Sequence, residues 1–253
     1  MNLGLDERVY IVTAASRGLG FATAQQLTAE GARVVVSART QEAVDRAVGE
    51  LGGPRSAHGV AADNADPDTA QRLVDAARQH FGRLDGILIS VGGPPAGTVG
   101  TVTDDQWRDA FESVFLGALR LARTTAAALG EGGAIGFVLS GTVRQPIAAL
   151  GISNGLRPGL AMAAKALADE LGPRGIRVIG LLPAQIDTER VQELDALGSD
   201  GGAARARNEQ AIPLRRYGRP EEFGRVAAFL LSPAASYLTG VMVPVDGGAL
   251  RGL

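Results

Sequence analysis

The sequence of 253 residues predicts an α/β protein of the Rossmann type, with a doubly wound sheet of about seven parallel strands and helices on both faces. Short apolar, β-branched runs alternate with stretches of helical periodicity, a pattern typical of repeated βαβ units. The runs are almost wholly apolar, as expected of strands covered by helices on both sides. Right-handed crossovers leave few topologies, and ligands are expected beyond the carboxyl ends of the strands.

The expected elements follow one another without a linker, so we expect a single Rossmann domain over residues 1–253. The strands are expected at Val9–Thr13, Arg33–Ser37, Ala57–Ala61, Gly86–Val91, Ala134–Leu139, Arg177–Leu181 and Val241–Val245. Helical stretches are expected at Gly18–Glu30, Gln41–Leu51, Asp68–Phe81 and Asp104–Leu129.

The segment 185–212 departs from this alternation, because it combines glycines with small and charged residues and contains no long strand pattern. Long segments of this kind often carry function, so we interpret residues 185–212 as a substrate lid. A surface insertion without a role is the alternative.

Composition and charge exclude several functional classes. The formal charge is −2 and the sequence has no basic stripe, which argues against nucleic acid as a partner. No run reaches the roughly 18 apolar residues of a membrane span, and the amino terminus has no leader pattern, so we expect a cytoplasmic protein. The chain has no cysteine, and His58 and His80 lack ligand-like spacing, so we expect neither disulfides nor a metal site.

A glycine-rich turn follows the first expected strand and opens the first expected helix. Its sequence is Thr13-Ala14-Ala15-Ser16-Arg17-Gly18-Leu19-Gly20. In such a turn, backbone N–H groups and the helix dipole attract a pyrophosphate, which predicts a dinucleotide site. The alternative is that Gly18 and Gly20 only permit tight packing of the strand against the helix.

This turn resembles that of the short-chain dehydrogenase/reductase family, which reads Thr-Gly-x-x-x-Gly-x-Gly, with Ala14 at the first glycine. Family patterns also follow the third, fourth and sixth strands, and Ala184 replaces a glycine in the last of them. Near its end the chain matches the family from Leu238-Thr239-Gly240 through Val245-Asp246-Gly247-Gly248. The resemblance implies cofactor contacts by Thr13, Ser16, Arg17, Gly18, Leu19, Gly20, Arg39, Asp63, Asn64, Gly92, Arg157, Pro183 and Thr188.

The charges near the second strand indicate which dinucleotide is bound. Ala38 occupies the position of the acid that would bind the ribose hydroxyls of NAD, and Arg39 follows it. Together with Arg17 it offers two guanidinium groups, which bind phosphate oxygens bidentately. We therefore expect NADP(H). Solvated arginines without partners are the alternative.

The resemblance is weaker at the catalytic positions. In the family, a tyrosine protonates the substrate oxygen, a lysine four residues later acidifies it, and a serine thirteen residues earlier orients the substrate. The corresponding residues here are Ser153, Arg157 and Ser140, and Val114 takes the place of a relay asparagine. A serine is a much poorer acid than a phenol, and an arginine does not readily give up its proton, so the usual acid is absent.

The remaining residues around this motif also depart from the family. Tyr10, Tyr217 and Tyr237 are the only tyrosines, and none obviously replaces the missing one. Pro158 cannot donate a backbone hydrogen bond, so we expect the helix to begin later or to be distorted at its start. Gly92-Gly93-Pro94-Pro95 and Ser153-Asn154-Gly155-Leu156-Arg157 look similar to a subgroup resembling 3-oxoacyl-carrier-protein reductases.

These observations favour an NADP(H)-dependent oxidoreductase of a small-molecule substrate with a non-standard site. Ser140, with Ser153 or Asn154, would hydrogen-bond a substrate oxygen, and Arg157 would hold the ribose hydroxyls and stabilise developing negative charge. The alternatives are a non-redox isomerase, cyclase or dehydratase, and a cofactor-binding protein without turnover. The resemblance also implies a homotetramer or homodimer, paired through the helix that carries Trp107, Phe111 and Phe115.

Overall fold

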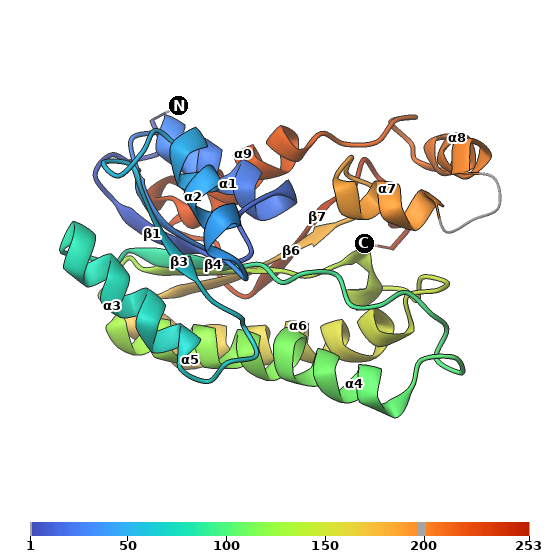
Figure 1. Ribbon diagram of the computed structural model, residues 1–253, viewed down its shortest axis with the longest axis horizontal. Coiled ribbons are helices and arrows are strands. Elements are labelled where there is room, and N and C mark those ends of the chain that lie inside the picture. Colours follow the sequence, from blue (N-terminus) through green and yellow to red (C-terminus); the bar gives the residue numbers. More distant parts are fainter. Residues whose placement is uncertain (1, 197–200, 253) are drawn as a thin grey trace.

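The computed structural model describes residues 2–196 and 201–252, with the side chains of residues 201–203 left aside, and it has three layers (Figure 1). A seven-stranded sheet in the order β3-β2-β1-β4-β5-β6-β7 forms the middle layer, and each neighbouring pair is parallel. The strands are β1 (Val9–Val12), β2 (Arg33–Ala38), β3 (Ala57–Ala61), β4 (Gly86–Ile89), β5 (Ala134–Val138), β6 (Arg177–Pro183) and β7 (Val241–Val245). The predicted doubly wound parallel sheet is confirmed.

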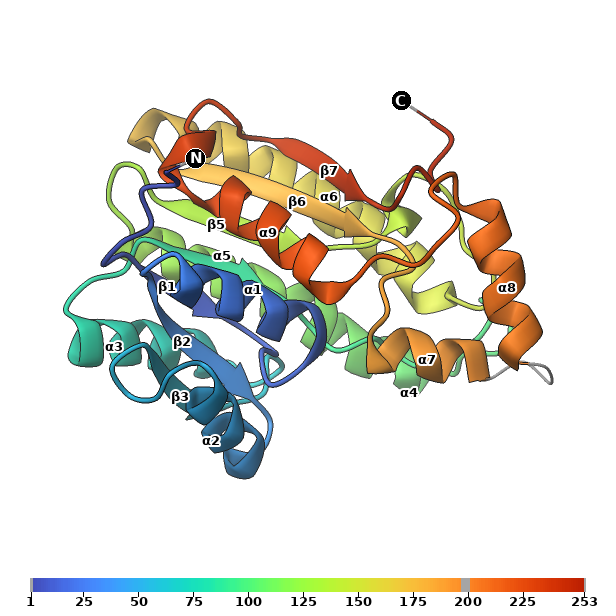
Figure 2. The same cartoon turned by 90° about the horizontal axis from the view of Figure 1, so that it is seen from above.

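Helices cover both faces of this sheet (Figures 1 and 2). One face carries α1 (Gly18–Ala29), α2 (Gln41–Glu50) and α9 (Pro220–Leu231). The other carries α3 (Thr69–Phe81), α4 (Asp104–Ala110), α5 (Gly117–Ala128) and α6 (Gly151–Leu171). Short 3-10 turns are η2 (Gly141–Val143), η3 (Gly172–Arg174) and η4 (Pro233–Ala235). The strand order reverses between β1 and β4, so the chain leaves these two strands in opposite directions and opens a crevice at their carboxyl ends.

The apolar core lies in two clusters, one on each face of the sheet. The first gathers around Leu73, Leu121 and Leu160, and the second around Leu27 and Phe223. Because both faces of the central strands are covered, the polar ends of the strands are the part of the sheet available to a ligand.

The long helix 104–128 contains a π-helical turn, η1 (Phe111–Leu116), between α4 and α5. The sequence predicted one uninterrupted helix here. Val114, at the family's asparagine position, lies in this turn and is buried with Ala110 and Ile152. The position is therefore part of the core.

Of the two expectations for Pro158, a later helix start or a distorted one, helix α6 corrects the first, because it starts at Gly151 and includes the proline. Tertiary contacts hold its first turn. The Gly151 N–H donates to the Gly97 carbonyl (2.8 Å), and the Asn154 side chain bonds both the N–H and the carbonyl of Ile147 (3.0 and 2.9 Å). These bonds stabilise the turn that the proline weakens.

The segment after β6 contains two helices, α7 (Glu189–Ala196) and α8 (Gly201–Ala211), which the sequence did not predict. Residues 197–200 of the expected lid lie outside the described residues. Figure 2 shows α7 and α8 beyond the arrowheads of β6 and β7, at the carboxyl end of the sheet. The segment thus stands next to the crevice.

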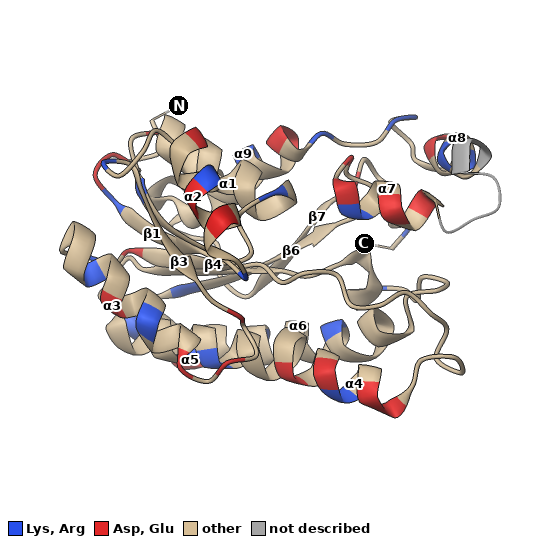
Figure 3. Cartoon of the chain, in the orientation of Figure 1, with Lys and Arg blue, Asp and Glu red and all other residues tan. Residues whose placement is uncertain are grey.

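The surface carries charges of both signs. In Figure 3, acidic and basic residues lie beside one another on α4 and α7, and Arg108 and Arg190 form ion pairs within these helices. Within residues 2–196 and 201–252, no helix combines the length and apolar character that a membrane crossing requires. The same residues include no cluster of three or more potential metal-ligating side chains.

Candidate functional site

Thr13 fixes the glycine-rich turn to the crevice between β1 and β4. Its hydroxyl donates to the Ser90 carbonyl (2.6 Å) and accepts from the Ser90 N–H (2.9 Å). The Ala15 N–H donates to the Ser37 carbonyl (2.8 Å), which ties the turn to β2 as well. The first turn of α1 is therefore held with its free N–H groups at the carboxyl end of the sheet.

Glycine is required at Gly18 and at Gly20 for different structural reasons. A Cβ on Gly20 would lie 2.8 Å from the Ala14 carbonyl oxygen, so this glycine permits close packing of α1 on β1. Gly18 has φ +60°, a left-handed conformation that glycine adopts without strain. Ala14 also has a positive φ, of 48°, although it carries a side chain. Tight packing of the helix against the strand therefore explains Gly20. It does not explain the positive φ angles of Ala14 and Gly18, which a turn that binds a ligand would require.

Arg17 stands at the start of α1 with its side chain 62% exposed, and it forms an ion pair with Glu189 at the start of α7. Arg39 is exposed directly after β2. A phosphate bound by Arg17 would therefore compete with the Glu189 carboxylate. The expectation of solvated arginines without partners does not describe Arg17.

Asn64 and Asp63 follow β3. The Asn64 side-chain amide donates to the Ser90 carbonyl (3.1 Å), the same oxygen that Thr13 binds. The Asp63 carboxylate accepts from the Ala65 N–H (2.9 Å) and so shapes its own loop. Asn64 thereby joins the ends of β1, β3 and β4.

Helix α7 reaches both walls of the crevice. The Thr188 methyl group lies 3.8 Å from where a Cβ on Gly18 would stand, so the start of α7 faces the turn. On the opposite side, the Arg190 guanidinium donates to the Pro94 carbonyl (2.6 Å), in the segment after β4 that also contains the exposed Gly92. Pro183, the last residue of β6, begins the connection to this helix.

The hydroxyl groups after β5 form a connected set. Ser140 caps η2, and its Oγ accepts from the Thr142 N–H (3.2 Å). Thr142 Oγ1 lies 3.2 Å from Ser153 Oγ, and Ser153 is only 5% exposed. Asn154, expected as an alternative substrate ligand, is instead engaged at both polar atoms by Ile147. The role of Asn154 toward a substrate oxygen therefore stays a prediction, and in this structure its side chain holds the segment before α6.

Arg157 is buried, with 6% of its surface exposed, and its Nη1 donates to the Val138 carbonyl (2.7 Å) at the end of β5. Within the described residues, no carboxylate comes within ion-pair distance of it. Burial lowers the pKa of its guanidinium to about 10, so it stays protonated at neutral pH. The site therefore contains a buried positive charge that α6 brings to Val138 in β5, two residues before Ser140 in the sequence.

The three tyrosines take no part in the hydroxyl set of Ser140, Thr142 and Ser153. Tyr10 is buried in β1, and its hydroxyl lies 3.4 Å from the Leu231 carbonyl, to which it donates. Burial raises the pKa of Tyr10 to about 12. Tyr217 donates to Asp195 of α7, and Tyr237 is fully exposed. Among the described residues, none of them bonds Ser140 or Arg157.

Comparison with known proteins places this geometry in a family. A sequence profile described as enoyl-(acyl carrier protein) reductase matches residues 13–249. Versicolorin reductase of Emericella nidulans is 33% identical, over 99% of this chain and 98% of the relative. A short-chain dehydrogenase/reductase from Brucella melitensis, named glucose/ribitol dehydrogenase, superimposes with a TM-score of 0.92 at 28% identity, over 100% of both chains. The chain belongs to the short-chain dehydrogenase/reductase family.

A structure with a bound cofactor is also similar to this short-chain dehydrogenase/reductase. L-sorbose reductase from Gluconobacter frateurii, solved with NADPH and L-sorbose, superimposes with a TM-score of 0.90 at 30% identity, over 100% of both chains. The chain is thus an oxidoreductase-type Rossmann protein, as the sequence predicted.

Sequence reasoning missed several residues of this short-chain dehydrogenase/reductase. Thr142 joins Ser140 to Ser153, and its place two residues after Ser140 was an available signal. Glu189 and Arg190 gave no local signal, because their partners Arg17 and Pro94 are far away in the sequence. Such contacts depend on the position of α7, which the sequence did not predict.

Proposed function

We propose that this short-chain dehydrogenase/reductase is an NADP(H)-dependent oxidoreductase that stabilises negative charge on its substrate without a tyrosine acid. The observation that carries the proposal is the combination of a preformed dinucleotide turn with a buried guanidinium, Arg157, which donates to the Val138 carbonyl at the end of the strand that leads to Ser140. The first part binds a cofactor and the second part acts on a substrate oxygen.

The residues at the crevice fit a dinucleotide. The amide groups of Gly18, Leu19 and Gly20 stand at the start of α1, where the helix dipole favours a pyrophosphate. Ser16 adds a hydroxyl to the same turn, and Thr188 faces it from α7. Asp63 and Asn64 would border the adenine, with Gly92 and Pro183 toward the nicotinamide.

The proposed choice of NADP(H) depends on charge. Ala38 ends β2 without a carboxylate, and Arg17 and Arg39 flank the place where a 2′-phosphate would lie. Guanidinium groups bind such a phosphate with paired hydrogen bonds, whereas a carboxylate would repel it. The NADPH-bound sorbose reductase supports this choice.

When bound, NADPH would supply a hydride to an electrophilic carbon of the substrate. The Ser140 oxygen accepts from the Thr142 N–H, so its own proton is available to a substrate oxygen. Ser153 holds Thr142 from the helix side. Arg157 stabilises negative charge on that oxygen through a low-dielectric interior, and it gives up no proton.

This arrangement favours substrates that need no strong acid at oxygen. An activated C=C bond fits, because its enolate oxygen is stabilised by charge and water can complete the protonation at carbon. A pre-protonated iminium also needs no acid, although it develops no negative oxygen for the Arg157 charge to stabilise. A plain ketone, whose oxygen must take a proton as the hydride arrives, is a poorer substrate.

We propose further that residues 185–212 act as a substrate lid, since the described helix α7 contacts both walls of the crevice. A homodimer or homotetramer would cover Phe111, which is 41% exposed and stacks on Phe115. A cytoplasmic location remains part of the proposal.

The experiment mixes purified protein with NADPH and panels of enones, imines and ketones, and follows the loss of NADPH absorbance. We expect turnover with enones or imines, and Ser140→Ala should reduce it about 100-fold. Ser236→Ala, at an exposed serine directly after η4, is the matched control and should leave the rate unchanged. Tight NADPH binding without oxidation in any panel would refute the redox proposal.

That outcome would favour one of two other functions, a non-redox enzyme or a cofactor-binding protein without turnover. The observation that favours these two functions is the burial of Ser153 and Arg157. Side chains that are not open to solvent can serve the structure of the protein and take no part in a redox reaction. Product analysis by mass spectrometry, without added reductant, identifies an isomerase, cyclase or dehydratase.

A further inference from the structure

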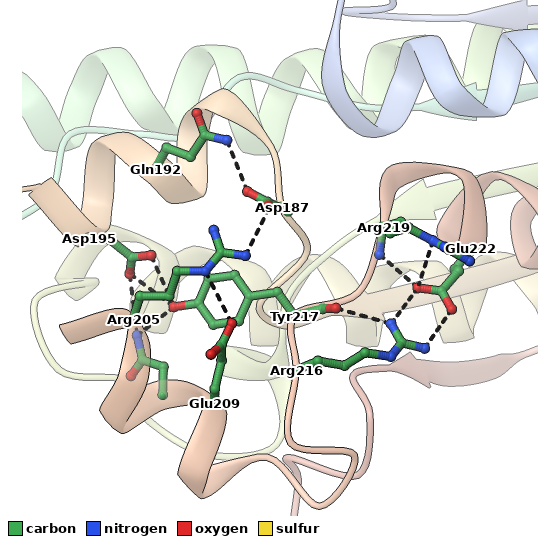
Figure 4. A network of polar contacts seen from close by, with 10 residues as sticks. Asp187, Gln192, Asp195, Arg205, Glu209, Arg216, Tyr217, Arg219 and Glu222 are labelled. Carbon is green, nitrogen blue, oxygen red and sulfur yellow. Dashed lines mark hydrogen bonds and ion pairs between the residues drawn. The ribbon is translucent and has the colours of Figure 1, made fainter. Parts of the chain in front are cut away.

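Tyr217 joins the two helices beside the crevice through one buried hydroxyl. It is 4% exposed and lies just before α9 in the chain. Its O–H lies 3.0 and 3.2 Å from the two Asp195 carboxylate oxygens in α7, and it accepts from the Asn208 amide in α8 (2.9 Å). Figure 4 shows the phenol oxygen of Tyr217 pointing toward the Asp195 carboxylate.

A second group of contacts starts from Arg205 of α8. Its guanidinium lies over the Tyr217 ring, 4.5 Å from the ring centre, and donates to the Asp187 carboxylate (2.9 Å) (Figure 4). Gln192 donates to the other Asp187 oxygen (2.9 Å). The Arg205 bond lowers the pKa of Asp187, which therefore stays ionised.

The backbone next to Tyr217 also holds the segment that leads into α7. The Asp187 N–H donates to the Gly218 carbonyl (2.8 Å), and the Gly218 N–H donates to the Gln185 carbonyl (3.0 Å). Asp187 is thus held by its side chain and by its backbone. The next residue is Thr188, which faces the glycine-rich turn, and then comes Glu189, the partner of Arg17.

The contacts of this network differ in strength. The Arg205 pair is 40% and 32% exposed at its two side chains, and exposed ion pairs contribute little to stability. The Tyr217 hydroxyl is buried and bonds a carboxylate, and such charge-assisted hydrogen bonds are the stronger class. The Tyr217 bond to Asp195 is therefore the stronger of these two side-chain attachments of α7 and the residues before it.

We propose that Tyr217 is a positioning residue for NADP(H), acting through Asp195 and α7 to hold Thr188 over the phosphate turn. This inference rests on the proposed function, since it assumes that the cofactor binds there. Loss of the hydroxyl frees α7, so Thr188 is correctly placed for only part of the time. The apparent affinity for the cofactor is then the intrinsic affinity multiplied by the fraction of time for which Thr188 is correctly placed.

The test measures NADPH binding by fluorescence titration for wild type, Tyr217→Phe, Thr188→Val and the double variant. We expect Tyr217→Phe to weaken binding about tenfold, which corresponds to the loss of one charge-assisted hydrogen bond. In the Thr188→Val background the same change should have little further effect, because both substitutions remove one interaction. Tyr237→Phe, at a fully exposed tyrosine, is the matched control.

Hydrogen exchange of the cofactor-free protein gives a second readout. Tyr217→Phe should speed exchange of the α7 amides and leave β1 and β4 protected. Asp195→Asn, which alters the same bond from its other end, should reproduce both results and covers the case in which Tyr217→Phe does not fold.

The outcomes separate the two proposals. If wild type does not bind NADPH, the proposed function fails, and this inference fails with it. If wild type binds but Tyr217→Phe binds equally well, only the positioning role is overturned. Full additivity of Tyr217→Phe and Thr188→Val would also overturn it, because Tyr217 would then act by another route.

Discussion

Arg157→Met tests whether the buried guanidinium is kept for function at the expense of stability. Methionine has a similar length and no charge. Burial lowers the pKa of Arg157 from its ordinary value to about 10, and each pKa unit corresponds to about 1.4 kcal/mol, so charge burial costs about 3 kcal/mol. The hydrogen bond to the Val138 carbonyl offsets roughly 1.5–3 kcal/mol of this cost.

The substitution should therefore leave the free energy of unfolding unchanged or raise it by up to about 1–2 kcal/mol. For a chain of this size that is a rise of roughly 2–8 °C in melting temperature, measurable by calorimetry. Turnover of NADPH should fall about 100-fold or more, because a charge that acts on the substrate oxygen is lost.

Arg177→Met is the matched control. Arg177 is also buried, but it donates to four carbonyl oxygens, those of Leu230, Leu231, Ser232 and Leu238. Its loss removes these donors from the carboxyl end of α9, where, among the described residues, Leu231 keeps only the Tyr10 hydroxyl, so we expect a destabilisation of about 3 kcal/mol or more. If Arg157→Met destabilised the protein as much as Arg177→Met, or kept full turnover, our account of Arg157 would be refuted.

Three further predictions concern the turn, the cofactor and pH. Ala14→Gly should raise the melting temperature by about 1–3 °C, because it removes a strained positive φ, partly offset by the greater freedom of glycine in the unfolded chain. The double variant Arg17→Ala with Arg39→Ala should weaken NADPH binding about 100-fold and leave NADH binding within threefold, as measured by titration of both cofactors. Burial and the nearby ring of His80 lower the pKa of His58 below its ordinary 6.5. The stability that comes from a neutral His58 is present above pH 6.5 and is lost as the pH falls through the lower folded-state pKa. Between pH 7.5 and about pH 5, the free energy of unfolding, measured by urea denaturation, should therefore fall less in His58→Gln than in wild type.

Much of the fold could be predicted because the strands are local, apolar and repeated. Each predicted strand exists, and the residues that follow β1, β3 and β4 meet at Ser90, as expected for a crevice at the strand ends. The prediction was correct where a short sequence pattern decided the structure.

The parts that sequence reasoning missed depend on contacts between distant segments. Pro158 indicates a helix boundary, but the bonds of Gly151 and Asn154 to residues outside the helix stabilise the preceding turn. Helix α8 contains two glycines at its start and has no clear apolar face. Tyr217 holds it from nine residues beyond Asn208, and no pattern in the segment itself indicates this contact. Tertiary interactions override local preference at these points.

The chemistry of the site leads to a last prediction, on the pH dependence of turnover. Ser140, Thr142 and Ser153 do not ionise near neutrality, and Arg157, with a pKa of about 10, keeps its charge. A reductase that depended on a phenol acid would respond to the ionisation of that phenol. Here kcat/KM for an enone should stay constant between pH 7 and about pH 9 and fall above about pH 10, as Arg157 loses its proton.

The measurement is a series of initial rates at constant ionic strength, with the Arg157→Met variant as the control. The decline above about pH 10 should be absent in that variant, because it has no guanidinium to titrate. If kcat/KM of the wild type instead fell with an apparent pKa between 7 and about 9, an acid other than Ser140, Thr142, Ser153 and Arg157 would be identified. The site would then transfer a proton itself, and the preference for enones over ketones would lose its basis, because that preference follows from charge stabilisation without proton donation.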